Sequence, residues 1–174
     1  MRRYFAVPGL NQARARALHF AATRSSLHGA ATATVDPAPP KPILLVDDEK
    51  SYTDILSLML GDNLNCPIHA FSRPIDALRA IPILDPAVIV TDYFMPEING
   101  IEFIRQATGI APNAVFIMIT GHNLSAEEET LARLTALKGF LAKPFGWRKL
   151  ADEILRVWPA GVTAPNHRAD VSAL

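Results

Sequence analysis

One short apolar run, followed at once by a carboxylate, constrains the fold of this chain more than any other feature. Residues 87–91 read Ala-Val-Ile-Val-Thr and lead directly into Asp92. An uninterrupted apolar run of this length predicts a strand that is buried on both faces of a parallel sheet. Pro96 and the pair Asn99-Gly100 follow within eight residues and predict a turn that leads into a helix. Asp92 is therefore expected at the carboxyl end of a buried strand, where open α/β sheets bind their ligands.

The same pattern recurs along residues 41–159. Apolar runs predict strands at 43–46, 67–71, 87–91, 115–119 and 139–142. Helical spacing, such as that of Ile55, Leu58 and Met59, predicts helices at 51–63, 73–80, 100–108, 125–137 and 146–158. Ser51 and Ser125 each begin a capping-box pattern, which predicts the start of a helix. Five strands that alternate with five helices predict an α/β fold with a doubly wound, five-stranded parallel sheet.

Composition excludes several classes of protein. No apolar run approaches the roughly 20 residues of a membrane span, so we expect no membrane partner. A single cysteine, Cys66, excludes an internal disulfide and fits a cytoplasmic location. Residues 41–159 carry eleven basic and fifteen acidic side chains, and this acidic balance argues against nucleic-acid binding by charge.

Residues 1–40 have a different composition from the rest. They contain five arginines and one acid, are rich in alanine, and end in a proline-rich stretch. The segment 11–24 is compatible with a basic amphipathic helix, and the composition resembles that of an organelle transit peptide. We favour a disordered extension whose residues 36–42 act as a stiff linker. We also expect a disordered tail at residues 160–174, which leaves 41–159 as the folded domain.

Four of the predicted strand ends carry side chains that can do chemistry. These side chains are Asp47 with Asp48, Asp92, Thr120, and Lys143. Each has an ordinary interpretation alone, as a helix entry, a turn cap, a strand-end hydroxyl or a surface charge. Together they place carboxylates, a hydroxyl and an ammonium at one edge of one sheet. Crowded carboxylates repel one another unless a cation lies among them, and their hard oxygens suit Mg²⁺.

The segments that carry these residues resemble a known family. They are Leu45–Glu49, Thr91–Gly100, Ile119–Gly121 and Phe140–Phe145. In order and spacing, the chain from about 41 to 159 is similar to the response-regulator receiver domains of two-component signal transduction, the CheY-like superfamily. This resemblance implies a (βα)5 fold with the flavodoxin-like strand order 2-1-3-4-5.

The resemblance also implies a role for each matching residue. Asp92 is expected to be the phosphoacceptor, and Asp47 and Asp48 to form an acidic pocket in which Asp48 is the preferred direct ligand of Mg²⁺. Asp92 and the backbone carbonyl of Phe94 would complete the protein's share of the metal ligands. Thr120 and Lys143 would bind the phosphoryl group. Thr120 and Phe140 would act as the switch residues.

The expected function follows from these roles. The resemblance implies a receiver that accepts a phosphoryl group from a histidine kinase or histidine phosphotransfer protein. Phosphorylation would then change the surface formed by residues 125–158, where a downstream protein binds. Only sixteen residues follow Trp158, so we expect a stand-alone receiver that catalyses only its own phosphorylation and dephosphorylation, and no other enzyme activity.

Three alternative functions compete with this interpretation. A Mg²⁺-dependent phosphohydrolase with an aspartate nucleophile needs a general acid two residues after it, and Phe94 cannot donate a proton. A flavodoxin-like cofactor carrier needs a phosphate-binding loop after the first strand, where Asp47 and Asp48 would repel a phosphate. A docking module in which phosphorylation is incidental stays open.

Overall fold

The structure is a computed structural model that describes residues 40–122 and 124–165. The predictions made for residues 1–39 and 166–174 lie outside the described residues. Within the described part, no helix combines the length and the hydropathy that crossing a membrane requires.

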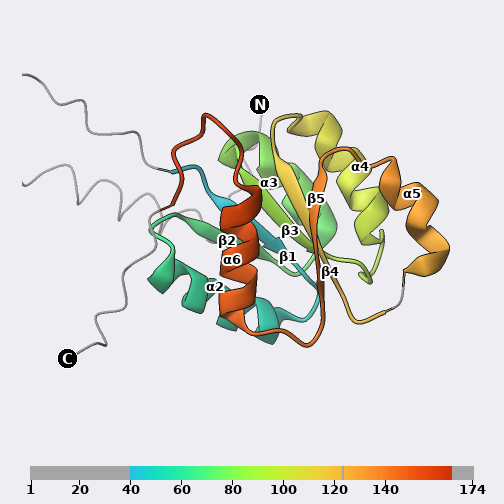
Figure 1. Ribbon diagram of the computed structural model, residues 1–174, viewed down its shortest axis with the longest axis horizontal. Helices are drawn as coiled ribbons and strands as arrows, with labels where there is room; N and C mark the ends of the chain where they lie inside the picture. Colours follow the sequence, from blue (N-terminus) through green and yellow to red (C-terminus); the bar gives the residue numbers. More distant parts are fainter. Residues whose placement is uncertain (1–39, 123, 166–174) are drawn as a thin grey trace, which may run out of the picture. The chain divides into compact units, whose positions relative to one another are not determined.

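Five parallel strands form one sheet in the order β2-β1-β3-β4-β5 (Figure 1). They are β1 (Ile43–Val46), β2 (Ile68–Phe71), β3 (Val88–Asp92), β4 (Val115–Thr120) and β5 (Leu137–Ala142). This order confirms the predicted doubly wound sheet with its flavodoxin-like topology. The central strand β3 is buried along its whole length, as its unbroken apolar sequence predicts.

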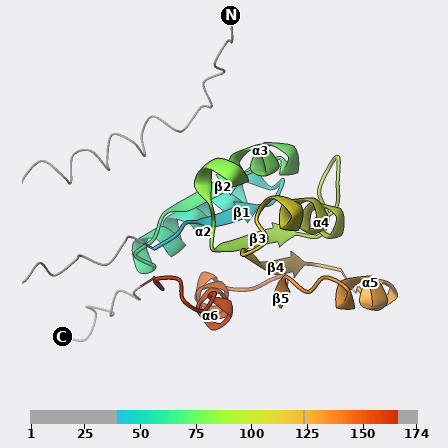
Figure 2. The ribbon, with the colours of Figure 1, turned by 90° about the horizontal axis from the view of Figure 1, so that it is seen from above.

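Helices cover both faces of the sheet (Figure 2). They are α2 (Lys50–Asn63), α3 (Pro74–Leu84), α4 (Gly100–Ile110), α5 (Glu128–Ala132), which follows the 3₁₀ turn η1 (Ser125–Glu127), and α6 (Trp147–Val157). Helices α2 and α6 pack on one face and α3 and α4 on the other, which gives two separate apolar clusters. Alternate residues of β1 point into different clusters, with Ile43 and Leu45 in the first and Leu44 and Val46 in the second. The sheet is thereby fixed from both sides.

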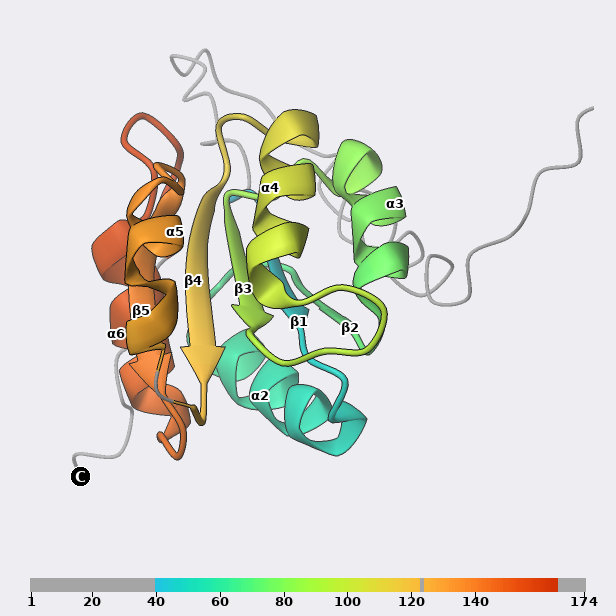
Figure 3. The same cartoon turned by 90° about the vertical axis from the view of Figure 1, so that its right-hand side faces the viewer.

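The register of the strands brings their carboxyl ends together. Val46 of β1 lies beside Thr91 of β3, and Asp92 lies beside Ile119 of β4. Figure 3 shows the arrowheads of β3 and β4 at the same end of the sheet. The polar residues that end or follow these strands therefore meet at one edge.

Helix α2 differs from its prediction in where it starts and in which face it buries. It begins at Lys50, its N-cap position is Glu49, and no side chain caps it. The capping box predicted at Ser51 is therefore wrong, because Ser51 already lies inside the helix. Ile55, Leu58 and Met59 have helical spacing but are exposed, whereas the buried face carries Thr53, Leu56 and Leu60.

The predicted helix at 125–137 is wrong in length. Ser125 lies in the 3₁₀ turn η1, and α5 spans only Glu128–Ala132, with Glu127 at its N-cap position and no side-chain cap. After α5, the Leu134 amide donates to the Leu131 carbonyl and the Leu137 amide to the Leu134 carbonyl. These three-residue spacings are turns that bring the three leucines against the second apolar cluster. Strand β5 consequently begins at Leu137, two residues earlier than predicted.

Two further segments extend beyond their predicted ends. Helix α3 continues through Pro82 to Leu84, four residues beyond its predicted end. After α6, the Trp158 indole donates to the Val162 carbonyl at 3.2 Å, and Val162 packs against the first apolar cluster. The chain between residues 159 and 162 thus folds back on the domain.

Gly100 allows α4 to begin directly against the end of β3. A Cβ at Gly100 would lie 2.5 Å from the Asp92 carbonyl oxygen and 3.0 Å from the Tyr93 Cα. The Gly100 amide also donates to the Tyr93 carbonyl at 2.8 Å. Both close contacts are with backbone, which cannot rotate away as a side chain can.

We expect Gly100→Ala to destabilise the fold by about 1–3 kcal/mol, because the new methyl group forces the backbone of the β3–α4 loop to move. Gly109→Ala, near the end of the same helix, is the matched control. A Cβ added at Gly109 would have nothing within 4 Å, so this variant should instead be more stable by up to about 1 kcal/mol. Urea unfolding measures both. A Gly100→Ala variant as stable as the parent would contradict this account of the loop.

Candidate functional site

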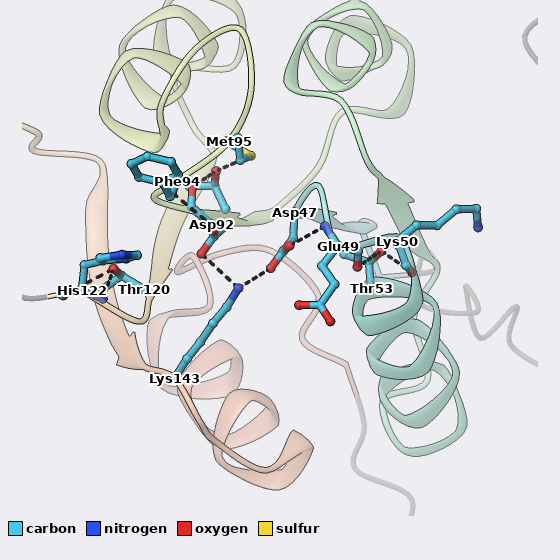
Figure 4. A network of polar contacts seen from close by, with 11 residues as sticks. Asp47, Glu49, Lys50, Thr53, Asp92, Phe94, Met95, Thr120, His122 and Lys143 are labelled. Carbon is cyan, nitrogen blue, oxygen red and sulfur yellow. Dashed lines mark hydrogen bonds and ion pairs between the residues drawn. The ribbon is translucent and has the colours of Figure 1, made fainter.

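Lys143 joins two carboxylates that come from different strands. Its Nζ lies 2.6 Å from Asp47 Oδ2 and 3.1 Å from Asp92 Oδ1. Figure 4 shows the Lys143 side chain reaching up between the two aspartates. Asp47 follows β1, Asp92 ends β3 and Lys143 follows β5, so the sheet register creates this three-residue contact.

Asp47 is the most enclosed of these groups, with a side chain only 2% exposed. Its second oxygen, Oδ1, accepts the Glu49 amide at 2.9 Å. Both carboxylate oxygens are thus hydrogen-bonded, which is what a buried charge requires. Asp47 therefore fixes the entry to α2 and holds the Lys143 ammonium in place.

Asp92 is held less tightly. Its Oδ2 accepts the Phe94 amide at 3.2 Å, while Oδ1 faces Lys143. Burial raises the pKa of the Asp92 carboxyl and the nearby Asp47 charge raises it further, although the hydrogen bond and charge of Lys143 oppose both. For Lys143, burial lowers the pKa, but the contacts with Asp47 and Asp92 outweigh it and leave the pKa raised. Lys143 is therefore protonated at neutral pH.

Asp48 completes a cluster of three carboxylates. Asp47, Asp48 and Asp92 each offer one oxygen, and these oxygens all lie within 4.8 Å of one another. Asp48 is exposed, unlike its two neighbours. Lys143 pairs with Asp47 and Asp92, and Asp48 adds a third carboxylate, so the pocket carries excess negative charge. Hard oxygen donors at this spacing, open to water on one side, suit Mg²⁺, which keeps several waters when it binds.

Thr120 lies at the end of β4 but points its hydroxyl into its own loop. Its Oγ1 accepts the His122 amide at 3.0 Å and lies 3.4 Å from the His122 carbonyl oxygen. The His122 ring stacks on the Phe94 ring, with centroids 5.6 Å apart. Phe94 is 68% exposed, so its ring lies at the surface rather than in the core.

Phe140 lies elsewhere. It is on β5, 48% exposed, and it lines a groove of about 440 Å³ with residues of α5 and the following turn. The structure thus brings Asp47, Asp48, Asp92 and Lys143 together, places Thr120 on the neighbouring strand end, and leaves Phe140 on the outer surface of the sheet edge.

Tyr52 belongs to this site and was not predicted. The Lys143 Nζ lies 5.2 Å from the centre of the Tyr52 ring, and that ring meets Phe145 edge-on at 6.0 Å. Burial raises the pKa of the Tyr52 hydroxyl. The sequence offers no signal for this role, since an aromatic residue in the first turn of a helix is usually part of the core.

We expect Lys143→Ala to lower the free energy of unfolding by about 1–3 kcal/mol, because it leaves the buried Asp47 charge without its cation. Lys41→Ala is the control, since the exposed pair of Lys41 with Asp85 (2.6 Å) should contribute less than about 1 kcal/mol. Because the pKa of Lys143 is raised from 10.5, its contribution is complete below that pH and disappears only as the pH rises through the higher, folded-state pKa. Equal losses for the two variants at pH 7 would contradict the arrangement described.

Known proteins share both the sequence pattern and the fold. The profile of the response regulator receiver domain matches residues 43–155. A protein-glutamate methylesterase/protein-glutamine glutaminase 2 of Saccharophagus degradans is 28% identical over 123 residues, which cover 67% of this chain and 35% of that protein. The transcriptional regulatory protein CreB of Escherichia coli is 28% identical over 116 residues, which cover 64% of this chain and 48% of CreB.

A solved structure agrees with these matches. The chemotaxis protein CheY4 of Vibrio cholerae superposes with a TM-score of 0.62 and 23% identity, over 68% of this chain and 98% of that one. At this identity the likeness concerns the fold. The family profile covers more than half of the present chain, and the chain therefore belongs to the response regulator receiver domains of two-component signalling.

Proposed function

We propose that this receiver accepts a phosphoryl group on Asp92 from a phosphohistidine of a histidine kinase or a histidine phosphotransfer protein. The observation that supports this most strongly is the Asp92 carboxylate at the end of the central strand, 3.1 Å from Lys143 Nζ. In the transfer, an Asp92 oxygen forms a bond to phosphorus as the phosphorus–nitrogen bond breaks. The imidazole nitrogen keeps the electron pair of that bond, and Asp92 becomes an aspartyl phosphate.

Lys143 and Thr120, from two different strand ends, would assist this transfer. The Lys143 ammonium, held in place by Asp47, offsets negative charge on the phosphoryl oxygens, where phosphoryl transfer gains most from a cation. Thr120 would donate its hydroxyl to another phosphoryl oxygen once that hydroxyl turns away from His122.

The carboxylate cluster fits the Mg²⁺ that receiver domains bind. Asp48, Asp92 and the backbone carbonyl of Phe94 would hold the ion, with Asp47 in the same pocket. When bound, Mg²⁺ supplies positive charge beside the phosphoryl oxygens. Asp48 is the exposed member of the cluster, so its carboxylate is free to reorient towards an ion without disturbing the core.

The downstream partner is proposed to bind the surface of residues 125–158. The groove beside Phe140 lies on this surface and is lined mainly by apolar side chains, with Glu128 and Thr135 as its polar members, which fits the apolar core and polar rim of a protein interface. Phe140 is half exposed in this structure. Its inward rotation, together with movement of Thr120, would change the shape of the groove and so switch partner binding.

We further propose 41–159 as the receiver unit, 1–40 as an extension with a linker and 160–174 as a tail, in a cytoplasmic protein without a separate enzyme substrate. The chain spans less than half the length of the two curated relatives described above. Their names, a methylesterase and a transcriptional regulator, describe those whole proteins. For the present chain we propose only that the receiver surface binds a downstream protein.

Asp92→Asn is expected to abolish phosphorylation, because the amide is a poor nucleophile at phosphorus. After incubation with acetyl phosphate and Mg²⁺, intact-mass spectrometry should show one added phosphoryl group on the parent protein and on Asp62→Asn, an exposed control on α2. An undiminished yield in Asp92→Asn would assign the phosphoryl group to another residue.

Asp48→Ala should weaken Mg²⁺ binding by about tenfold or more, because the ion loses an anionic ligand. Tyr52 lies 5.2 Å from Lys143, so tyrosine fluorescence should report a Mg²⁺ titration at this pocket. Asp62→Ala, which removes an equal charge near the C-terminal end of α2, should bind like the parent. Equal weakening in the two variants would point to a general charge effect instead of a site.

A further inference from the structure

Two exposed aromatic rings bridge the loops on either side of the Asp92–Thr120 gap. Phe94 follows β3, His122 follows β4, and their rings stack at 5.6 Å with an interplanar angle of 29°. Figure 4 shows both rings on the Thr120 side of Asp92, away from Lys143. We name this pair the Phe94–His122 clasp. A phenylalanine that is 68% exposed adds little to the core. Its ring has two aromatic neighbours, His122 with centroids 5.6 Å apart and the adjacent Tyr93 at 6.5 Å, and the His122 contact is the one that joins two loops.

The clasp is connected to Thr120 through the backbone of His122. The His122 amide donates to Thr120 Oγ1 at 3.0 Å, and the same hydroxyl lies within 3.4 Å of the His122 carbonyl oxygen. The side chain of Thr120 is only slightly exposed. Its hydroxyl is therefore committed to the turn at 120–122, and a change in the position of His122 would change the orientation of that hydroxyl.

We infer that His122 is a positioning residue that, through the clasp, holds Thr120 in a resting orientation and so opposes closure of Thr120 onto a phosphoryl group. This inference rests on the proposed phosphorylation of Asp92. Closure requires the Thr120 hydroxyl to leave the His122 backbone and face Asp92, which moves the turn that carries the His122 ring. Phe94 is anchored separately, by its amide to Asp92 Oδ2, so the stack resists this movement.

The size of the effect follows from the strength of such a stack. An aromatic pair contributes the equivalent of about a two- to tenfold change in an equilibrium constant. A contact made only in the resting state shifts the population towards that state by the same factor. Removing either ring should therefore raise the apparent affinity of the protein for a ligand that binds the closed state by about two- to tenfold.

A double-mutant cycle tests this coupling. Phe94→Leu, His122→Leu and the double variant remove one or both rings but keep the His122 amide, and both positions are exposed, so folding should be unaffected. The probe is beryllium fluoride with Mg²⁺, which mimics a phosphoryl group on a carboxylate, and ¹⁹F NMR measures the bound fraction. Each single variant should bind about two- to tenfold more tightly than the parent, and the double variant no more tightly than the singles. His69→Leu, on the far edge strand β2, should bind like the parent.

The clasp would be overturned if the gains of the two single variants added up in the double variant, or if either single variant bound the probe no more tightly than the parent. An equal gain in His69→Leu would also overturn it. If the parent itself does not bind the probe, the proposed function fails and the clasp is judged by amide hydrogen exchange in the unliganded protein. There, Phe94→Leu should speed exchange of the His122 amide by about two- to tenfold, because the turn has lost its stack. Unchanged exchange at that amide would overturn the clasp independently of phosphorylation.

Discussion

The arrangement of this receiver depends on one electrostatic constraint, the crowding of three carboxylates around one ammonium. Asp47, Asp48 and Asp92 present oxygens within 4.8 Å of one another, and Lys143 contacts two of the three aspartates. Like charges at this separation repel strongly where water is partly excluded. The residues of the pocket are therefore held in place, but their negative charges outnumber the positive charge of Lys143. A bound cation or a modification of Asp92 would change this charge balance.

The rest of the fold keeps these charges from moving apart. Two apolar clusters pack against the two faces of the sheet. The ends of β1 and β3 therefore cannot separate to relieve the repulsion. Gly100 ties the start of α4 to the backbone of Asp92 and Tyr93. By contrast, two of the side chains proposed to move, His122 and Phe140, lie at the surface, and Thr120 is the nearly buried group between them and Asp92. A rigid charged centre surrounded by adaptable side chains is what a local switch requires.

The sheet and most of the site could be predicted from the sequence, because strand burial and strand-end chemistry are local signals. The run from Ala87 to Asp92 predicts a buried strand regardless of its partners. The register then places Asp92 beside Asp47, and the long Lys143 side chain reaches Asp92 from the end of β5. The capping patterns at Ser51 and Ser125 failed, since Glu49 and Glu127 occupy the N-cap positions of α2 and α5 instead. Such details depend on tertiary packing, as does the shortening of the 125–137 helix. The contact of Tyr52 with Lys143 and the stack of Phe94 on His122 join segments far apart in sequence, and no local pattern predicts them.

The central claim, that the pocket holds excess negative charge which a divalent cation relieves, is tested most directly by equilibrium unfolding of the unmodified protein. Urea unfolding is measured with increasing Mg²⁺ and, in parallel, with NaCl at matched ionic strength. Because an ion that binds only the folded state stabilises it as the concentration rises past the Kd, Mg²⁺ should raise the free energy of unfolding well beyond the effect of NaCl. Identical stability in the two salts would show that screening alone acts on the carboxylates and would contradict the account.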